Sequence, residues 1–339
     1  MPEAAMKIID VHCHIVPADF PATPPTCAPE KWPRMEDRGN GQRAMMTGKR
    51  EMRVVDNRAW EAARRIADMN GEDVGMQAIS PMPEILSYWL DAPSAQTMAR
   101  YMNKTIAELA HAAPDRFVGL GMVPLQDPEL AAKELATLRS DGLIGVEIGS
   151  NINGKSPGDP FFDPFYAEAE RQDLAIFVHA LHPTMTDRLV GPPMVAPYVA
   201  FPTDIGLAGA SIITGRVLEK FPKLRIGLSH GGGTLAMFLP RLENGWQKLP
   251  ALKNAFASPV QAARQLYYDN VVFDKKLLRY LIEAYGDTQV FVGSDYPFTA
   301  GQKNSAAMFD GIGLSAEQLE RLRGGNAARF LNLQNAAKA

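Results

Sequence analysis

The segment MKIIDVHCH, residues 6–14, joins an apolar run to two histidines that are one residue apart. The apolar and β-branched residues before the histidines are typical of a buried strand, on which successive side chains alternate between the two faces. His12 and His14 therefore point to the same side, with their Cα atoms roughly 6–7 Å apart. Two imidazoles at that spacing suit a common metal ion, although a lone pair of histidines on a strand is usually solvated surface.

The other histidines add weight to a metal site. The chain contains six histidines, and His179 and His230 also stand where apolar runs end, in FVHALHPT and LSHGGG. His182 lies three residues beyond His179 in a loop, so we expect it to line the entrance of the site, with a ligand role in place of His179 as the alternative. His111 lies in the helical pattern at 94–113 and is expected to have no catalytic role.

Short apolar runs recur along the whole chain and alternate with amphipathic stretches. After the first strand, the runs are 76–80, 116–123, 143–148, 175–178, 224–229, 268–273 and 289–294. Helical patterns occupy 58–70, 128–140, 165–172, 205–221 and 275–285. Eight strands alternating with helices predict an α/β fold of the (β/α)₈ TIM-barrel type. No GxGxxG motif follows the first strand, which disfavours a dinucleotide-binding fold.

Composition is that of an ordinary globular protein. The 339 residues are 46% hydrophobic and 22% charged, so we expect a single domain over 1–333, followed by a tail at 334–339. The net charge of -3 without a long basic run argues against nucleic acid or a membrane surface as partner. Two cysteines form no disulfide framework, and no signal-type or membrane-length apolar segment is present, so a cytoplasmic location is expected.

One stretch, 17–56, departs from the alternation. It is rich in proline, methionine and charge, and it follows directly after the first strand. A long insertion at the catalytic end of a barrel is more often functional than a simple linker. We therefore expect it to cover the substrate.

Barrel enzymes place their catalytic groups at the C-terminal ends of the strands, where the strand-end histidines and Asp295 would meet. Asp295 lies in VFVGSDYPF, where a turn or helix-cap role is the alternative to a ligand role. Three imidazoles and one carboxylate suit Zn²⁺ or a similar ion better than Mg²⁺ or Ca²⁺. The run LIGVEIGSN offers no lysine that could be carbamylated to bridge two metals, so one ion is expected. Glu147 in that run is interpreted as an internal polar contact.

His230 could be a further ligand or a base. If His12, His14, His179 and Asp295 hold the ion and water takes the remaining position, His230 is free to accept a proton from that water. The alternative is an imidazole that only packs against the glycines at 231–233. We interpret His230 as the base.

Several longer motifs point to one family. They are RRIADMNGEDVGMQAIS (64–80), ILSYW (85–89), DRFVGLGMVPLQDPELAAKEL (115–135), EKFPKL (219–224), SHGGG (229–233), GSDYPF (293–298) and GNAARFLNL (325–333). Together they resemble the amidohydrolase superfamily, in particular its branch of metal-dependent decarboxylases typified by 2-amino-3-carboxymuconate 6-semialdehyde decarboxylase. The resemblance covers nearly all of the chain after the first strand.

The resemblance carries implications for individual residues. It implies one divalent metal, with Zn²⁺ expected first and Mn²⁺ as the alternative, and no organic cofactor. The implied ligands are His12, His14, His179 and Asp295. His230 and Asp295 are the expected catalytic residues, and His230 activates the bound water. Arg53, Arg241, Tyr88 and His182 are expected to contact substrate; Arg241 in LPRLENGW reaches the site of a neighbouring subunit, which implies a homodimer.

The implied activity is non-oxidative decarboxylation of a carboxymuconate semialdehyde or of a hydroxy- or amino-benzoate in aromatic catabolism. The chain has His179-Ala180-Leu181 where the muconate-semialdehyde enzymes have His-Pro-Trp, and MVAPYVAFPTD (194–204) where they have a tryptophan-rich loop. The substrate is therefore expected to differ. Two alternatives remain: a metal-dependent C–C bond, ester or lactone hydrolase or hydratase at the same site, and a metal-binding barrel without turnover.

Overall fold

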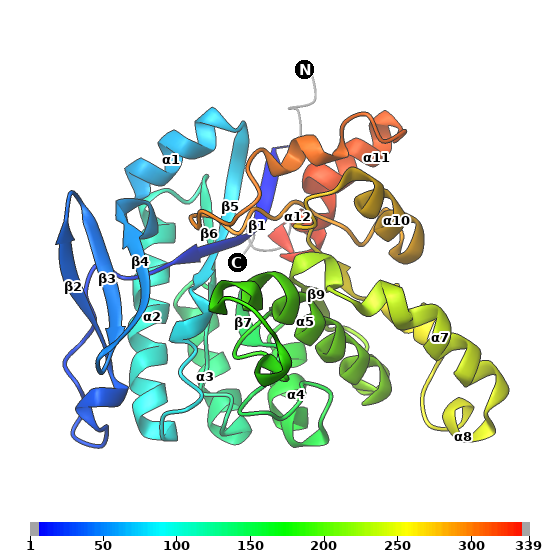
Figure 1. Ribbon diagram of the computed structural model, residues 1–339, viewed down its shortest axis with the longest axis horizontal. Helices are drawn as coiled ribbons and strands as arrows, with labels where there is room; N and C mark the ends of the chain where they lie inside the picture. The colour runs from blue at the N-terminus through cyan, green and yellow to red at the C-terminus, as the bar shows by residue number, and fades with distance from the viewer. Residues whose placement is uncertain (1–6, 334–339) are drawn as a thin grey trace.

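The computed structural model describes residues 7–333. Within them, seven parallel strands form a curled sheet in the order β1-β5-β6-β7-β8-β9-β10 (Figure 1). The strands are β1 (Ile8–Ile15), β5 (Val74–Pro81), β6 (Phe117–Gly121), β7 (Gly145–Gly149), β8 (Ala175–His179), β9 (Arg225–Leu228) and β10 (Tyr267–Tyr268). The expected parallel, strand–helix architecture is confirmed. The predicted tail, 334–339, lies outside the described residues.

The segment predicted as the eighth strand, 289–294, is not a continuous strand. It pairs with its neighbours through isolated bridges, from Val290 to β10 and from Val292 to β1. Side chains take two of the N–H groups that a regular ladder would use, because Gly293 donates to Asn270 (2.9 Å) and Ser294 donates to Asp10 (3.0 Å). Eight regular strands were predicted, and seven are confirmed.

The strand predicted at 268–273 is also shorter than expected. Only Tyr267–Tyr268 is paired as β10, because N–H groups of the following residues donate to acceptors within their own segment. The N–H of Val271 donates to the carboxylate of Asp269 (3.0 Å), and that of Val272 donates to the carbonyl of Asn270 (2.9 Å). The polar pair Asp269-Asn270 therefore ends the strand at the edge where the site lies.

Helices surround the sheet (Figure 1). They are α1 (Ala62–Gly71), α2 (Ala92–Ala112), α3 (Pro128–Ser140), α4 (Asp163–Arg171), α5 (Ala196–Thr214), α6 (Val217–Lys220), α7 (Leu235–Lys248), α8 (Pro250–Lys253), α9 (Pro259–Ala263), α10 (Lys275–Tyr285), α11 (Ala316–Glu320) and α12 (Asn326–Phe330). The helix predicted at 205–221 differs from the structure in two ways: α5 begins nine residues earlier, and the left-handed Arg216 (φ 63°) separates it from α6.

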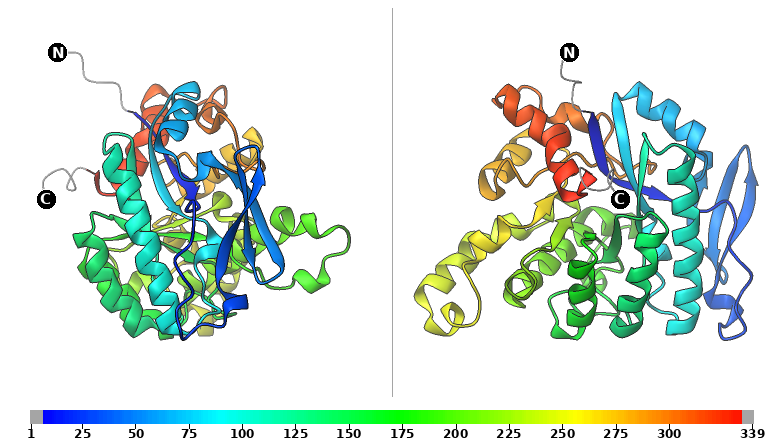
Figure 2. Two further views of the ribbon diagram at one scale, coloured as in Figure 1. Left: turned by 90° about the vertical axis from the view of Figure 1, so that its left-hand side faces the viewer. Right: turned by 180° about the vertical axis from the view of Figure 1, so that it is seen from behind.

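The insertion at 17–56 forms an antiparallel sheet of its own within the described chain. Its strands are β2 (Pro33–Gly39), β3 (Gln42–Thr47) and β4 (Arg50–Asp56), drawn in blue at one side of the barrel beside α2 (Figures 1 and 2). Met45 and Val55 are buried and join the main hydrophobic core. The insertion is therefore anchored to the barrel by apolar packing.

A second apolar cluster fills the interior of the barrel below the strand ends. It gathers residues from several strands and from α12, among them Val11, Phe177, Phe291 and Phe330. The ring of Phe177 lies 5.2 Å from the ring of His12, so this packed layer is the floor of the site. No helix in the described chain combines the length and the apolar character that crossing a membrane requires.

Candidate metal centre and its surroundings

Four side chains meet at the C-terminal ends of the strands. His12 and His14 stand near the end of β1, His179 is the last residue of β8, and Asp295 follows the bridging segment 289–294. Within residues 7–333, each of the four offers a ligand atom, and these atoms all lie within 4.8 Å of one another. The prediction that these four residues converge is confirmed.

The atoms that face the centre of this group have no hydrogen-bond partner in the described chain. They are Nε2 of His12, Nε2 of His14, Nε2 of His179 and Oδ1 of Asp295, and all four are buried. Leaving a buried polar atom unpaired costs about 1–3 kcal/mol, so four such atoms around one point need an explanation. A divalent cation bound by three imidazole nitrogens and one carboxylate oxygen satisfies all of them.

The opposite nitrogen of each imidazole is held by an acceptor. The Nδ1 contacts are His12 with Asp269 (2.6 Å), His14 with the carbonyl of Pro81 (3.1 Å) and His179 with the carbonyl of Ala180 (2.9 Å). These contacts hold a proton on each Nδ1 and turn each Nε2 toward the centre, where it can bind a cation once the ring is neutral. The donor set is thus preorganised for a cation.

The charges of the group support the same conclusion. Burial alone would lower the pKa of His12, but the carboxylates of Asp295 and Asp269 outweigh it and raise this pKa to about 10. Burial alone would raise the pKa of Asp295, but the His12 and His14 imidazoles hold it well below its usual range. Burial and the neighbouring imidazoles hold the pKa of His179 well below its usual value. The carboxylates therefore attract positive charge, which a cation supplies as well as a proton does.

Asp295 and His230 both adopt left-handed backbone conformations, with φ of 62° and 54°. Such values are uncommon outside glycine and concentrate at functional sites, where the surrounding structure holds them. The N–H of Asp295 donates to the carbonyl of His12 (2.8 Å), which ties this carboxylate to β1.

His230 lies beside the four-residue group rather than within it. Its ring centroid is 5.4 Å from that of His12 and 5.1 Å from that of His179, and its Nδ1 contacts Ser229 Oγ at 2.9 Å. Burial and the charge of His12 lower the pKa of His230 to about 4. The imidazole is therefore neutral near pH 7 and able to accept a proton, and its assignment as the base stays a prediction.

Asp269 is a site residue that the sequence reasoning missed. It is fully buried, and its carboxylate accepts hydrogen bonds from His12 Nδ1 (2.6 Å) and from the backbone N–H groups of His230 (2.9 Å), Gly231 (2.7 Å) and Val271 (3.0 Å). Burial would raise its pKa, but these hydrogen bonds and the charge of His12 lower it. The available signal was the polar pair Asp269-Asn270 within the run YDNVVF, directly at a strand end.

Glu147 lies behind His14 on the buried side of β7. Ser80 donates to its Oε2 (2.5 Å), which is 3.5 Å from His14 Nδ1. Burial raises the pKa of Glu147 to about 7. The internal polar contact expected for Glu147 is confirmed.

Arg53 reaches toward the centre from β4 in the insertion. Its guanidinium carbon lies 4.3 Å from the centroid of the Phe298 ring, and that ring stacks on His14 with centroids 5.4 Å apart and an interplanar angle of 27°. Arg53 Nη2 donates to Glu84 Oε1 (2.5 Å), while its buried Nε has no partner in the described residues. The Phe298 ring thus lies between Arg53 and the His14 imidazole.

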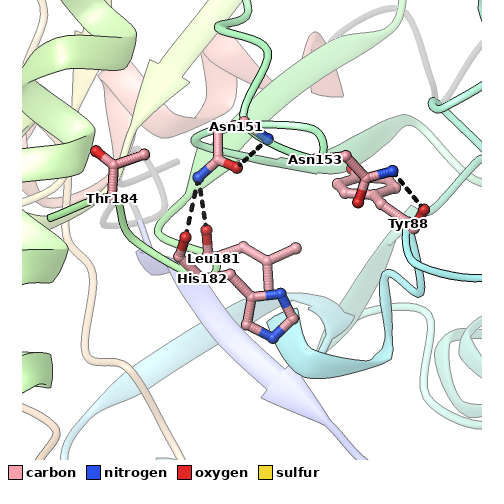
Figure 3. A pocket seen from close by; sticks show the side chains of 7 residues that line it. Tyr88, Asn151, Asn153, Leu181, His182 and Thr184 are labelled. Atoms are coloured by element: carbon pink, nitrogen blue, oxygen red, sulfur yellow. Dashed lines mark hydrogen bonds between the residues drawn. The ribbon is translucent and has the colours of Figure 1, made fainter. Parts of the chain in front are cut away.

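His182 and Tyr88 line a pocket of about 170 Å³ at the same end of the barrel. The other lining residues are Asn151, Asn153, Gly154, Leu181 and Thr184 (Figure 3). His182 is exposed, and its ring lies 5.2 Å from that of Trp89. Tyr88 is buried, and its hydroxyl accepts from the N–H of Gly149 (3.1 Å). The group of candidate ligands contains His179 and not His182, so the alternative ligand finds no support in the geometry.

Arg241 is not brought to this centre within one chain. It is exposed on α7, a helix that the sequence reasoning did not predict, and no ion pair or hydrogen bond of its side chain is found across residues 7–333. Its role in a neighbouring subunit therefore stays a prediction.

Comparisons with known proteins identify a family and relatives that this chain resembles. A family model described as amidohydrolase matches residues 9–333. The 2-amino-3-carboxymuconate-6-semialdehyde decarboxylase of Dictyostelium discoideum is 32% identical over 331 residues, covering 96% of this chain and 91% of the relative.

Solved structures show the same fold. The 5-carboxyvanillate decarboxylase of Sphingomonas paucimobilis superposes with a TM-score of 0.80 and 24% identity, covering 96% of this chain and 99% of that one. A dihydroxybenzoic acid decarboxylase of Polaromonas sp. JS666, solved with bound manganese and the inhibitor 2-nitroresorcinol, gives a TM-score of 0.74 and 20% identity over 97% and 98% of the two chains.

Proposed function

Because the chain belongs to the amidohydrolase family, we propose that it is a metal-dependent, non-oxidative decarboxylase of a carboxymuconate semialdehyde or of a hydroxy- or amino-benzoate. The observation that carries the proposal is the set of four buried, unpartnered ligand atoms with the His230 imidazole beside them. The curated relative from D. discoideum, which matches almost the full chain, is itself a decarboxylase and supports the reaction type.

The proposed cofactor is one divalent cation, held by His12, His14, His179 and Asp295. Zn²⁺ fits the nitrogen-rich donor set, and Mn²⁺ is the ion bound in the Polaromonas structure. When bound, the cation supplies Lewis acidity that stabilises negative charge on the substrate. No organic cofactor is proposed.

The residues of the chain have distinct parts in the proposed reaction. Arg53 orients a substrate carboxylate, because its guanidinium lies one ring away from His14 and keeps a nitrogen without a partner. The bond between the ring or diene carbon and the carboxylate breaks, CO₂ leaves, and its electron pair stays on that carbon. His230, which is neutral, accepts a proton from water and passes it to that carbon.

The pocket of Figure 3 is proposed to select the substrate. His182, Tyr88 and Leu181 line it. The family resemblance implies that Leu181 stands where the muconate-semialdehyde enzymes have tryptophan. A smaller aliphatic side chain at that position leaves different space beside the metal centre. We therefore propose a substrate that is related to, but different from, that of the D. discoideum enzyme.

The finer architecture belongs to the proposal as well. We propose that 289–294 completes a closed (β/α)₈ barrel, that 1–333 is one domain and that the insertion at 17–56 covers bound substrate. We further propose a cytoplasmic homodimer in which Arg241 contributes to the neighbouring site. The contact of Arg53 with Phe298 supports the covering role, since it brings β4 to the rim of the centre.

Measurement of CO₂ tests the reaction. The protein is loaded with Zn²⁺ or Mn²⁺ and incubated with a panel of carboxylated muconate semialdehydes and of hydroxy- and amino-benzoates; chelator-treated protein is the control. We expect stoichiometric CO₂ and the decarboxylated product from at least one acid. Turnover of lactones or esters without any CO₂ release would replace the proposal with a hydrolase at the same centre.

A further inference from the structure

We propose that Asp269 is a positioning residue that couples the metal ligand His12 to the proton-carrying His230 through a single shared carboxylate oxygen. Oδ2 of Asp269 lies 2.6 Å from His12 Nδ1 and 2.9 Å from the backbone nitrogen of His230. Both groups donate to this oxygen when the imidazole carries its proton on Nδ1. The inference rests on the proposed function for the role of His230, and on the geometry alone for the role of Asp269 toward His12.

The hydrogen bond between Asp269 and His12 is strong. A donor–acceptor distance of 2.6 Å to an ionised carboxylate is short for a nitrogen donor, and such charge-assisted bonds are roughly twice as strong as neutral ones. Neither His12 nor Asp269 is exposed to solvent, so water does not compete for the bond. The bond fixes the orientation of the ring and increases the basicity of Nε2, the atom that faces the cation.

The second oxygen of Asp269 holds the turn that carries His230. Oδ1 accepts from the N–H groups of Gly231 (2.7 Å) and Val271 (3.0 Å), so the carboxylate lies at the N-terminal end of the 3-10 turn η7 (His230–Gly232). Buried backbone N–H groups need acceptors, and this carboxylate supplies them. The carboxylate thus holds the turn in place through hydrogen bonds to its backbone.

The turn needs such support because its backbone is unusual. Residues 230–233 all have positive φ, with values of 54°, 62°, 75° and 58°. A Cβ atom at Gly231 would come within 2.5 Å of Val272 Cγ1 and 2.8 Å of Leu281 Cδ1. Four consecutive left-handed residues, with a histidine first, persist only where surrounding contacts determine them.

Other buried aspartates of the barrel do not join a ligand and the base in this way. Asp10 accepts from the backbone of His12 (3.2 Å) and from Ser294, but from no imidazole. Asp204 accepts from Ser150, Asn151 and Thr184 in the loops after β7 and β8. Asp204 is therefore a matched control: it is a buried aspartate with several hydrogen bonds at the same end of the barrel, and none of them goes to a candidate ligand.

The first test measures cation affinity. In Asp269→Asn, the amide N–H₂ must face either the His12 imidazole or the N–H groups of Gly231 and Val271. The hydrogen bonds on one side of residue 269 are therefore lost. We expect the affinity for Zn²⁺, measured by chelator competition, to fall about 10–100-fold. His230→Asn and Asp204→Asn are expected to keep the wild-type affinity. An Asp269→Asn protein with wild-type affinity would overturn the inference.

The second test isolates the link to His230 with a double-mutant cycle at saturating Zn²⁺. Asp269→Asn is expected to lower kcat about tenfold or more in the wild-type background. In the His230→Asn background, it is expected to lower kcat no further, because the group that it positions is already absent. Equal losses in both backgrounds would show that Asp269 acts on turnover independently of His230 and would contradict the coupling.

A third measurement needs no variant and so does not depend on Asp269→Asn folding. In Zn²⁺-loaded protein with ¹⁵N-labelled histidine, we expect one imidazole N–H of His12 to resonate far downfield and to exchange slowly with water. A His12 imidazole without such a proton would overturn the bond on which the inference stands. The affinity and resonance measurements use no substrate. If they succeed while no acid releases CO₂, the proposed function fails and the role of Asp269 toward the ligand stands.

Discussion

The metal centre and the pocket beside it lie at the same end of the barrel, but they are built differently. The ligand atoms come from strand ends, are buried, and are fixed by hydrogen bonds on their far sides. The pocket is built from loops, and its His182 is exposed and has a left-handed backbone. The difference indicates that the strands determine which chemistry is available, whereas the loops determine which acid is accepted.

The largest expected effect is loss of the cation. His12→Ala and Asp295→Asn each remove one of the four proposed ligands, so metal content and activity are expected to fall together to background. Metal analysis beside steady-state kinetics checks this, with His182→Ala as the control that changes only the pocket. Full metal content in the His12 or Asp295 variant would mean that the cation lies elsewhere.

The next largest effect is expected at His230. His230→Asn should keep the wild-type metal content and lower kcat about 10²–10⁴-fold, the usual contribution of a general acid or base. The same two measurements apply. If the variant instead loses metal in parallel with activity, His230 is a ligand and the site needs another base.

Arg53 lies against the Phe298 ring that stacks on His14, so its substitution should affect substrate handling but not the cation. Removing a charged hydrogen-bond donor costs about 1.5–3 kcal/mol, which predicts a fall in kcat/KM of roughly 10–100-fold for Arg53→Met, mainly through KM. Arg38→Met is the control, because Arg38 lies on the same small sheet and pairs with the exposed Glu36 and Glu51. Unchanged kinetics for Arg53→Met would remove it from the substrate site.

The metal centre should also respond to pH. In the cation-free protein, burial would lower the pKa of His12, but Asp295 and Asp269 raise it to about 10. The ring therefore holds a proton at neutral pH that must leave when the cation binds. Cation affinity should rise with pH and fall about tenfold for each unit of acidification below that pKa. Affinity for Zn²⁺ that is constant between pH 6 and 8 would contradict this account.

The smallest effect is expected in the pocket itself. His182→Ala should leave metal content unchanged and alter KM less than about fivefold, as is usual for an exposed side chain outside a buried network. Comparison with His179→Ala, which should lose metal, makes the test specific. Loss of metal in the His182 variant would exchange the roles of the two histidines.

The candidate ligands could be predicted from the sequence because each follows an apolar run, and parallel strands bring their C-terminal ends together. Asp269 also stands at a strand end, but its role depends on backbone N–H groups of a left-handed turn 38 and 39 residues away in sequence, which no local pattern reveals. The irregularity of segment 289–294, which was predicted as a strand, could not be predicted for a similar reason. Side chains of Asp10 and Asn270 accept hydrogen bonds from its N–H groups.

The regions outside the centre were harder to predict. The start of α5 and the whole of α7 contain internal prolines, Pro202 and Pro240, which indicate a helix break when the sequence is considered alone. The position of Arg53 depends on a register within the small sheet, where Met45 pairs with Arg53 across β3 and β4. The resemblance to a family identified Arg53, and the residues alone would not have done so.

A crystal structure of the Zn²⁺-loaded protein, with anomalous scattering recorded at the zinc absorption edge, would test the proposed centre. The account predicts one anomalous peak per chain, about 2.0–2.2 Å from Nε2 of the three histidines and from a carboxylate oxygen of Asp295. A chain with no peak at this position, with two peaks, or with zinc bound by His182 or His230 would contradict it.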